Sequence, residues 1–338
     1  MRAATKRQGE GRPATKSRTD NSVAIPATYQ CDPLLWVSWL YHHDEMTQSQ
    51  IADLLGVSRA TVVNYLQQAK ANHYVKVSVR TELLGSVELA TEMKEAFGLA
   101  ACMVIPDDGG LRSPAERIGK AAAQYMEQTV VPGDVLGVAW GRTVLETAEN
   151  LADRPVPNVT VVQLMGSQRG AYDGLGAEEC ASLIALKLHG RTANLHAPAV
   201  LSSRELRETL SREPIIQEQF QRIRSCNKIL FGVCTVKENS LVFASRLTSP
   251  DESKFFVSNG AVGVIAGRFF DAQGRWITGD LDERLMGITL DEIRQIPTRI
   301  AVAGGLDKVD ALVGALKGQF ANVLITDAQA ARGVLERR

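Results

Sequence analysis

Three glycine-containing segments each follow a short apolar run and lead into a predicted helix, an arrangement suited to binding an anion. The first is Leu136–Thr143, in which Gly141 ends the run and a helix begins near Arg142. A helix N-terminus presents free backbone N–H groups and the positive end of the helix dipole. The spacing matches neither the G-x-G-x-x-G dinucleotide loop nor the Walker loop. We therefore expect a single phosphate or a phosphorylated sugar here, with an ordinary tight turn as the alternative.

The second and third segments would complete the same site. Residues 163–170 carry small polar side chains after a predicted strand, and residues 303–309 place Lys308 in the first turn of a helix. A lysine is unfavourable in a first turn because of the helix dipole, so its presence there indicates an anionic partner. Asp327 would cap the final helix. The predicted ligand-binding residues are Trp140, Gly141, Arg142, Thr143, Gly166, Ser167, Gln168 and Lys308.

Alternating strands and helices must position these segments. Apolar, β-branched runs occur at 101–105, 135–139, 159–164, 229–233, 262–266, 300–303 and 323–325, and helical patterns at 114–128, 142–151, 177–189, 307–316 and 328–336. Nearly continuous apolar strands separated by helices predict a mostly parallel sheet covered on both faces. We expect a doubly wound α/β domain over 99–338, with its ligand at the carboxyl ends of the strands.

Residues 47–66 carry the pattern of two helices joined by a tight turn. Thr47 and Gln50 have the spacing of a capping box, and Ser58 can cap the second helix. Gly56 suits the left-handed conformation that ends a helix. The predicted inner faces are Ile51, Leu54 and Leu55 in the first helix, and Val62, Leu66 and Ala69 in the second. The pattern predicts a helix-turn-helix whose second helix enters the major groove of DNA.

The outward face of the second helix favours DNA over the alternative of a simple packing hairpin. No carboxylate occurs from Ser58 to His73, and the outward residues are hydrogen-bonding types that include Gln68. Such side chains suit base edges and phosphates. The predicted DNA contacts are Thr47, Gln48, Ser58, Arg59, Thr61, Asn64 and Tyr65, with Lys76 on a following strand.

The flanks of this pair predict a winged helix-turn-helix domain over 29–81. A preceding helix has Asp32 as its N-cap and Pro33 as its first residue, with Leu35, Trp36, Trp39 and Leu40 predicted to face the core. Residues 74–80 alternate apolar and polar, which predicts a wing strand.

Two further segments flank this domain. Apolar residues recur at helical spacing over 82–98, which predicts a linker helix. Residues 1–28 are basic and poor in large apolar side chains, so we expect a disordered arm that either touches DNA or only solubilises the chain.

Bulk properties restrict the class of protein. The formal net charge over 338 residues is zero, so any affinity for DNA must come from a local surface. Five dispersed cysteines without metal-ligand spacing are typical of reduced thiols. No apolar run reaches the length of a membrane span, and the N-terminus lacks a signal-peptide core. We expect a cytoplasmic protein that binds no membrane, metal or cofactor.

Five segments, in order over about 300 residues, resemble the SorC/DeoR-type sugar-binding transcriptional regulators: 46–59, 137–143, 260–263 with 267–271, 303–308 and 323–327. The resemblance implies a regulator of a carbohydrate or polyol catabolic operon, acting as repressor or activator. It implies an effector domain similar to sugar-phosphate isomerases, with phosphate at Trp140–Thr143 and a contact from Lys308. It also implies double-stranded operator DNA, a phosphorylated sugar or polyol and further copies of the chain as partners, in a dimer or tetramer.

Two positions depart from the family pattern. Val264 stands where an acidic residue often binds effector hydroxyls, and Asn259 and Asp280 are the alternative candidates for this role. Met165 stands where some members have a lysine that forms a Schiff base, so we expect no covalent capture.

Two rival functions remain. The first is a sugar-phosphate isomerase or deaminase with an appended DNA module, which would need a positioned carboxylate or histidine. His189 and His196 have no carboxylate neighbour in sequence, so we expect no enzyme. The second is a constitutive DNA binder without an effector, which the glycine loops disfavour.

Overall fold

The computed structural model describes residues 32–72, 74–75, 87–168, 176–237 and 247–338. Its contacts divide the chain into two compact units, Met1–Val79 and Arg80–Arg338. The predicted basic arm, residues 76–80 of the predicted wing strand with Lys76, and the start of the linker helix lie outside the described residues. The predicted domain boundaries therefore stay a prediction.

Three helices form the described part of the first unit: α1 (Pro33–His42), α2 (Gln48–Leu55) and α3 (Arg59–Ala71). They begin and end where local chemistry predicts. The Asp32 side chain accepts from the N–H of Leu34, Thr47 forms the capping box of α2, and Ser58 accepts from the N–H of Thr61. Gly56 ends α2 with φ +65°.

The buried core of this unit is Val37, Leu40, Ile51, Ala52, Leu55 and Val62. The predicted inner faces are wrong for three residues, since Leu35, Trp39 and Leu54 are 46%, 50% and 58% exposed. Val37 and Leu40 of α1 are buried and lie three positions apart, so they share one face of the helix. Leu35 and Trp39 lie off that face and are therefore exposed. Trp39 instead stacks on His43 with ring centroids 4.0 Å apart.

A seven-stranded sheet forms the centre of the second unit. Its order is β1 (Ala101–Ile105), β11 (Val323–Asp327), β10 (Thr298–Val302), β5 (Lys228–Gly232), β2 (Val135–Val138), β3 (Thr160–Gln163), β4 (Arg191–Ala193). Every neighbouring pair is parallel, which confirms the predicted mostly parallel sheet. From β2 the chain proceeds outward through β3 and β4, and from β5 it proceeds the other way through β10 and β11. The neighbouring strands β2 and β5 are thus the topological switch point, where such sheets bind ligands.

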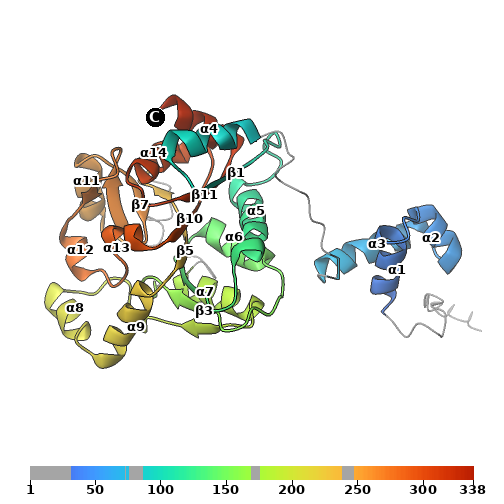
Figure 1. The fold of residues 1–338 in the computed structure, drawn as a ribbon, viewed down its shortest axis with the longest axis horizontal. Helices are drawn as coiled ribbons and strands as arrows, with labels where there is room; N and C mark the ends of the chain where they lie inside the picture. The colour runs from blue at the N-terminus through green and yellow to red at the C-terminus, as the bar shows by residue number, and fades with distance from the viewer. Residues whose placement is uncertain (1–31, 73, 76–86, 169–175, 238–246) are drawn as a thin grey trace, which may run out of the picture. The chain divides into compact units, whose positions relative to one another are not determined.

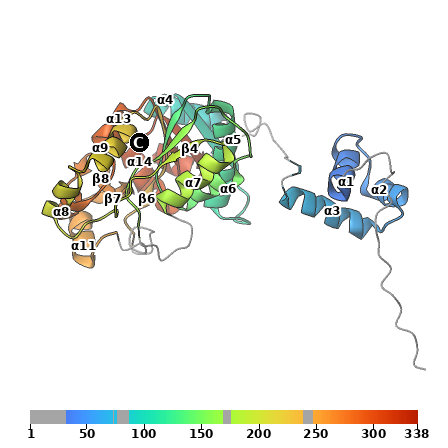
Figure 2. The ribbon, with the colours of Figure 1, turned by 90° about the horizontal axis from the view of Figure 1, so that it is seen from below.

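Helices cover both faces of this sheet (Figures 1 and 2). One face carries α5 (Pro114–Thr129), α6 (Arg142–Asn150) and α7 (Ala177–Lys187), and one hydrophobic cluster joins them to the strands. The other face carries α4 (Val87–Phe97), α9 (Pro214–Arg224), α13 (Leu290–Gln295), α14 (Val309–Lys317) and α15 (Ala328–Glu336), over a second cluster. The helix ends at the carboxyl edge of the sheet are thereby held in fixed places.

A second, antiparallel sheet corrects one prediction. It contains β6 (Cys234–Thr235), β7 (Ala261–Ile265), β8 (Arg268–Asp271) and β9 (Trp276–Ile277), and the helices α8 (Arg204–Leu210), α11 (Pro250–Ser258) and α12 (Asp280–Arg284) complete this part of the unit. The apolar run 262–266 was predicted in the parallel sheet, but it lies here. Ala266 and Gly267, with φ of +47° and +81°, turn the chain back into β8, so the run pairs as a hairpin.

Candidate functional site

The recognition surface of the first unit lies on α3. Arg59, Asn64 and Gln68 are exposed, and Thr61 and Tyr65 are partly exposed. The Arg59 Nε donates to Gln48 Oε1 at 3.3 Å, which joins the starts of α2 and α3. The helix contains no aspartate or glutamate. This face therefore offers hydrogen-bonding groups and positive charge to an anionic partner.

Several predicted DNA contacts also have structural tasks. The Thr47 hydroxyl accepts from the N–H of Gln50 at 3.3 Å, and the hydroxyls of Ser58 and Thr61 lie 2.9 Å apart. Tyr65 packs against the hydrophobic cluster of this unit. Arg59 and Asn64 are thus the predicted contacts that are exposed and take no part in a cap, and Lys76 lies outside the described residues.

A cavity of about 250 Å³ lies at the carboxyl ends of β2, β5 and β10, next to the switch point. Its walls come from four strand ends that lie far apart in the sequence. The lining residues are Ser113, Pro114, Ala115, Gly141, Arg142, Thr143, Gly232, Val233, Cys234, Thr235, Gly304, Asp307 and Lys308. Four of the predicted ligand-binding residues are among them: Gly141, Arg142, Thr143 and Lys308.

The N-terminus of α6 faces this cavity without a side-chain cap. Gly141 is its N-cap and has φ +138°, a conformation that favours glycine. A Cβ built on Gly141 would meet no atom within 4 Å, so the space in front of the helix is open. The first N–H groups of α6 receive no side-chain cap and are available to a ligand.

Two cations lie at the same cavity. The half-buried Lys308 precedes α14, which also lacks a side-chain cap, and its Nζ donates to the Val233 carbonyl at 2.9 Å. Within the described ranges, neither Lys308 nor Arg142 forms an ion pair with a carboxylate. Their charge is therefore available to a bound anion.

Cys234 is a buried thiol on this wall. Burial raises the pKa of Cys234, while the charge of Lys308 acts in the opposite direction. The thiol is consequently neutral at ordinary pH and adds no negative charge. The described cysteines, Cys102, Cys180, Cys226 and Cys234, are all free thiols.

The other predicted ligand residues do not line this cavity. Trp140 is 5% exposed and belongs to the hydrophobic core. Gly166 is glycine for another reason: its Cβ would lie 2.5 Å from the carbonyl oxygens of Ala197 and Pro198. Ser167 donates its hydroxyl to Glu178 at 2.8 Å, and Gln168 contacts the sulfur of Met165. Residues 166–168, which follow β3, are thus held by contacts with other residues of the chain and do not line the cavity.

Sequence reasoning missed two walls of the cavity. Ser113 to Ala115 begin α5 after β1, and Gly232 to Thr235 follow β5. Neither segment has the composition by which the ligand loops were recognised in the sequence, but each follows a predicted strand. The switch point would have identified the second wall if the strand order had been known.

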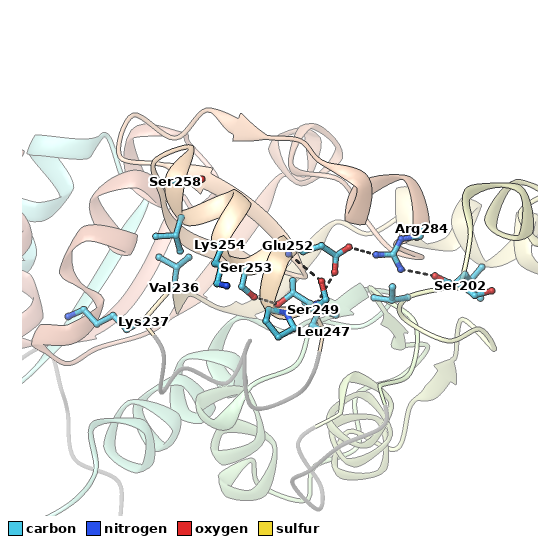
Figure 3. A pocket seen from close by; sticks show the side chains of 15 residues that line it. Ser202, Val236, Lys237, Leu247, Ser249, Glu252, Ser253, Lys254, Ser258 and Arg284 are labelled. Atoms are coloured by element: carbon cyan, nitrogen blue, oxygen red, sulfur yellow. Dashed lines mark hydrogen bonds and ion pairs between the residues drawn. The ribbon is translucent and has the colours of Figure 1, made fainter.

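A wider hollow of about 1940 Å³ lies beside α11 (Figure 3). The polar groups around the start of α11 already have partners: Ser249 and Glu252 form the capping box of α11, Glu252 pairs with Arg284, and Thr248 and Ser253 share a hydrogen bond of 2.7 Å. Because α11 is fully capped and the Arg284 charge is neutralised, this hollow is less suited to an anion than the smaller cavity.

Neither His189 nor His196, the histidines of the second unit, lines the cavity, and His189 with its partner lies far from it. His189 follows α7 and bonds Asp153 at 2.6 Å, a carboxylate partner that the sequence did not reveal. Both side chains are more than half exposed, and both residues precede the strands β4 and β3. They therefore lie at the amino edge of the sheet, opposite the cavity.

As for the membrane, no helix within the described residues is long and apolar enough to span one.

Comparisons with known proteins bear on the family and the fold of the chain. A family model described as "Putative sugar-binding domain" matches residues 81–336. An uncharacterized transcriptional regulator, YjhU of Escherichia coli K12, is 38% identical over 322 residues, or 94% of this chain and 98% of that protein. The deoxyribonucleoside regulator of Bacillus subtilis is 33% identical, covering 88% and 95%. The full-length sorbitol operon regulator SorC of Klebsiella pneumoniae superposes with TM-score 0.74 at 25% identity, covering 89% of this chain and 97% of that one.

Proposed function

The chain belongs to the SorC/DeoR-type family of sugar-binding transcriptional regulators, and from this premise we propose that a phosphorylated sugar or polyol controls its activity. The DNA would be the operator of a carbohydrate or polyol catabolic operon. The α3 face with Arg59 and Asn64 would contact it, and the cavity at Lys308 would hold the effector. The relatives are named as regulators, which supports a regulatory role over an enzymatic one.

One observation carries the phosphate part of this proposal. Two helices, α6 and α14, begin at the cavity without side-chain caps, and two cations, Arg142 and Lys308, lie there without an ion-pair partner in the described chain. Free N–H groups, positive dipole ends and cations together favour a dianion. The hydroxyls of a neutral sugar can accept hydrogen bonds from these groups, but they leave both positive charges without a counter-charge.

The size of the cavity limits the ligand. Its volume of about 250 Å³ lies below the roughly 300–1,000 Å³ of sites for drug-sized ligands. A phosphate with a short carbon chain suits this space better than a nucleotide. Asp307 and Thr235 on the wall would accept or donate hydrogen bonds to sugar hydroxyls.

We infer a homo-oligomer, a dimer or a tetramer, as the functional unit. Helix-turn-helix proteins read paired half-sites about one helical turn apart, which takes two modules in a fixed relation. An effector that favours one arrangement of subunits would change that relation. The coupling needed is about 1–3 kcal/mol.

A thermal-shift panel tests the effector class. Each sugar phosphate is compared with the same sugar lacking phosphate, and inorganic phosphate serves as the minimal probe. A ligand at 100 times its Kd adds about 2.7 kcal/mol of apparent stability, so phosphorylated members should raise the Tm while their neutral counterparts do not. An equal response to both, or none to any phosphate, would contradict the proposal. Active compounds then enter gel shifts with genomic fragments selected by the protein.

A further inference from the structure

One buried carboxylate joins the ligand loop to the last helix. Asp327 ends β11 and is 6% exposed. Its Oδ2 accepts from the N–H of Gly305 at 2.6 Å, and its Oδ1 accepts from the N–H of Ala330, in the first turn of α15, at 2.8 Å. The two oxygens of one side chain thus hold two different elements.

The loop is shaped to reach this carboxylate. A Cβ on Gly304 would lie 2.0 Å from Asp327 Oδ2, so only glycine lets the backbone approach so closely. Gly305 has φ +95°, and its carbonyl accepts from the N–H of Lys308 at 3.1 Å. Asp327 therefore fixes Gly305, and Gly305 in turn fixes the start of the turn that carries Lys308.

Helix α15, the second element held by Asp327, contacts the part of the second unit that follows the helix-turn-helix in sequence. Helix α15 packs against the turn at Leu306–Lys308 and against α4. Met93 of α4 is fully buried, so α4 is firmly attached to the second unit. It is also the first described helix of that unit after the helix-turn-helix.

We propose that Asp327 is a positioning residue for the effector, which places Lys308 through Gly305 and joins the ligand loop to α15 and α4. This role rests on the proposed function of the cavity. Asp327 is not among the residues that line the cavity, so it acts through the loop and does not contact the ligand. An anion that orders Gly304–Lys308 also orders the first turn of α15.

Two substitutions separate positioning from simple capping. Serine caps helices about as well as aspartate, so Asp327→Ser retains a cap for α15, but its single hydroxyl cannot serve Gly305 as well. The matched control is Asp310→Asn, which removes an exposed ion pair between α14 and Arg337, at the opposite end of α15 from Asp327, and removes neither of the Asp327 bonds. Both variants lose one negative charge.

The probe is inorganic phosphate, titrated against the full-length chain with the Tm as readout. We expect Asp327→Ser to bind phosphate at least about tenfold more weakly than wild type, since a hydrogen bond to a charged group is lost from the loop, and Asp310→Asn to bind as wild type. Hydrogen exchange gives the second readout. Phosphate should slow exchange in residues 326–336 of the wild type and of Asp310→Asn, but not of Asp327→Ser.

Each outcome has a distinct meaning. A wild type that ignores phosphate overturns the anion site itself, and the role of Asp327 with it. A wild type that responds, together with an Asp327→Ser variant of equal affinity and equal protection in 326–336, overturns the role of Asp327 and leaves the anion site standing.

Discussion

Replacing Lys308 with methionine removes the main cation of the cavity while keeping an apolar side chain of similar length. An ammonium has three donors, and one of them goes to the Val233 carbonyl at 2.9 Å, which leaves two for a ligand. A hydrogen bond to a charged group contributes about 1.5–3 kcal/mol. Since 1.4 kcal/mol is tenfold in affinity, we expect the Kd for phosphate to rise about 10- to 150-fold. The lost bond to the Val233 carbonyl should lower the free energy of unfolding by about 1.5–3 kcal/mol.

Calorimetric titration with inorganic phosphate measures this change, and Lys317→Met is the matched control. Lys317 is exposed and lies in the last turn of the same helix, α14, at the opposite end from the loop that carries Lys308. It should bind phosphate as the wild type does. An unchanged Kd in Lys308→Met, or an equal loss in Lys317→Met, would refute the assignment of the cavity as the anion site.

Three more substitutions probe other parts of the chain. Gly166→Ala should cost about 1–3 kcal/mol of stability by crowding the carbonyl of Ala197 without weakening phosphate binding, as melting and titration together would show. Burial acts to raise the pKa of Asp134, but hydrogen bonds, chiefly from Lys228, outweigh burial and hold the pKa below its ordinary value. Asp134→Asn should therefore lower the free energy of unfolding by about 3–5 kcal/mol at neutral pH. In denaturant melts this difference between wild type and variant should shrink as the pH falls below about 4, where the wild-type carboxylate becomes protonated. Asn64→Ala should weaken specific DNA binding by about 1–3 kcal/mol in fluorescence anisotropy and leave phosphate affinity unchanged.

The features that the sequence predicted well depend on nearby residues. Thr47, Gly56 and Ser58 each satisfy or end a helix within a few positions, so the limits of α2 and α3 follow from local chemistry. Six of the seven parallel strands are short apolar runs between helices, and their bounds agree with the predicted ones within two residues. The edge strand β4, Arg-Thr-Ala, has no apolar run and was not predicted. Gly141 and Lys308 were predicted as ligand residues because a glycine turn and a lysine are unusual at a helix start, and both line the cavity.

The failures depend on pairing between distant segments. The run at 262–266 is as apolar as the parallel strands, and only the turn at Gly267 assigns it to the second sheet. Gly166 looks like a ligand glycine in sequence, yet the backbone at Pro198 is what requires it. The bond between Asp327 and Gly305 spans 22 positions, and no local pattern encodes it. Such contacts exist only once the strand order is known.

Helix starts in the second unit differ in whether a side chain caps them. Serine, threonine or aspartate caps α5, α8, α11, α13 and α15, whereas α7, α9 and α12 have no side-chain cap, nor do α6 and α14 at the cavity. A missing cap costs about 0.5–2 kcal/mol, and phosphate oxygens in the open space before Gly141 would supply the missing acceptors. Ligand binding would then recover this energy only in the arrangement that aligns α6 with Lys308. That amount is comparable to the 1–3 kcal/mol by which effectors couple to a second site, so one uncapped helix can supply most of the free energy that regulation needs.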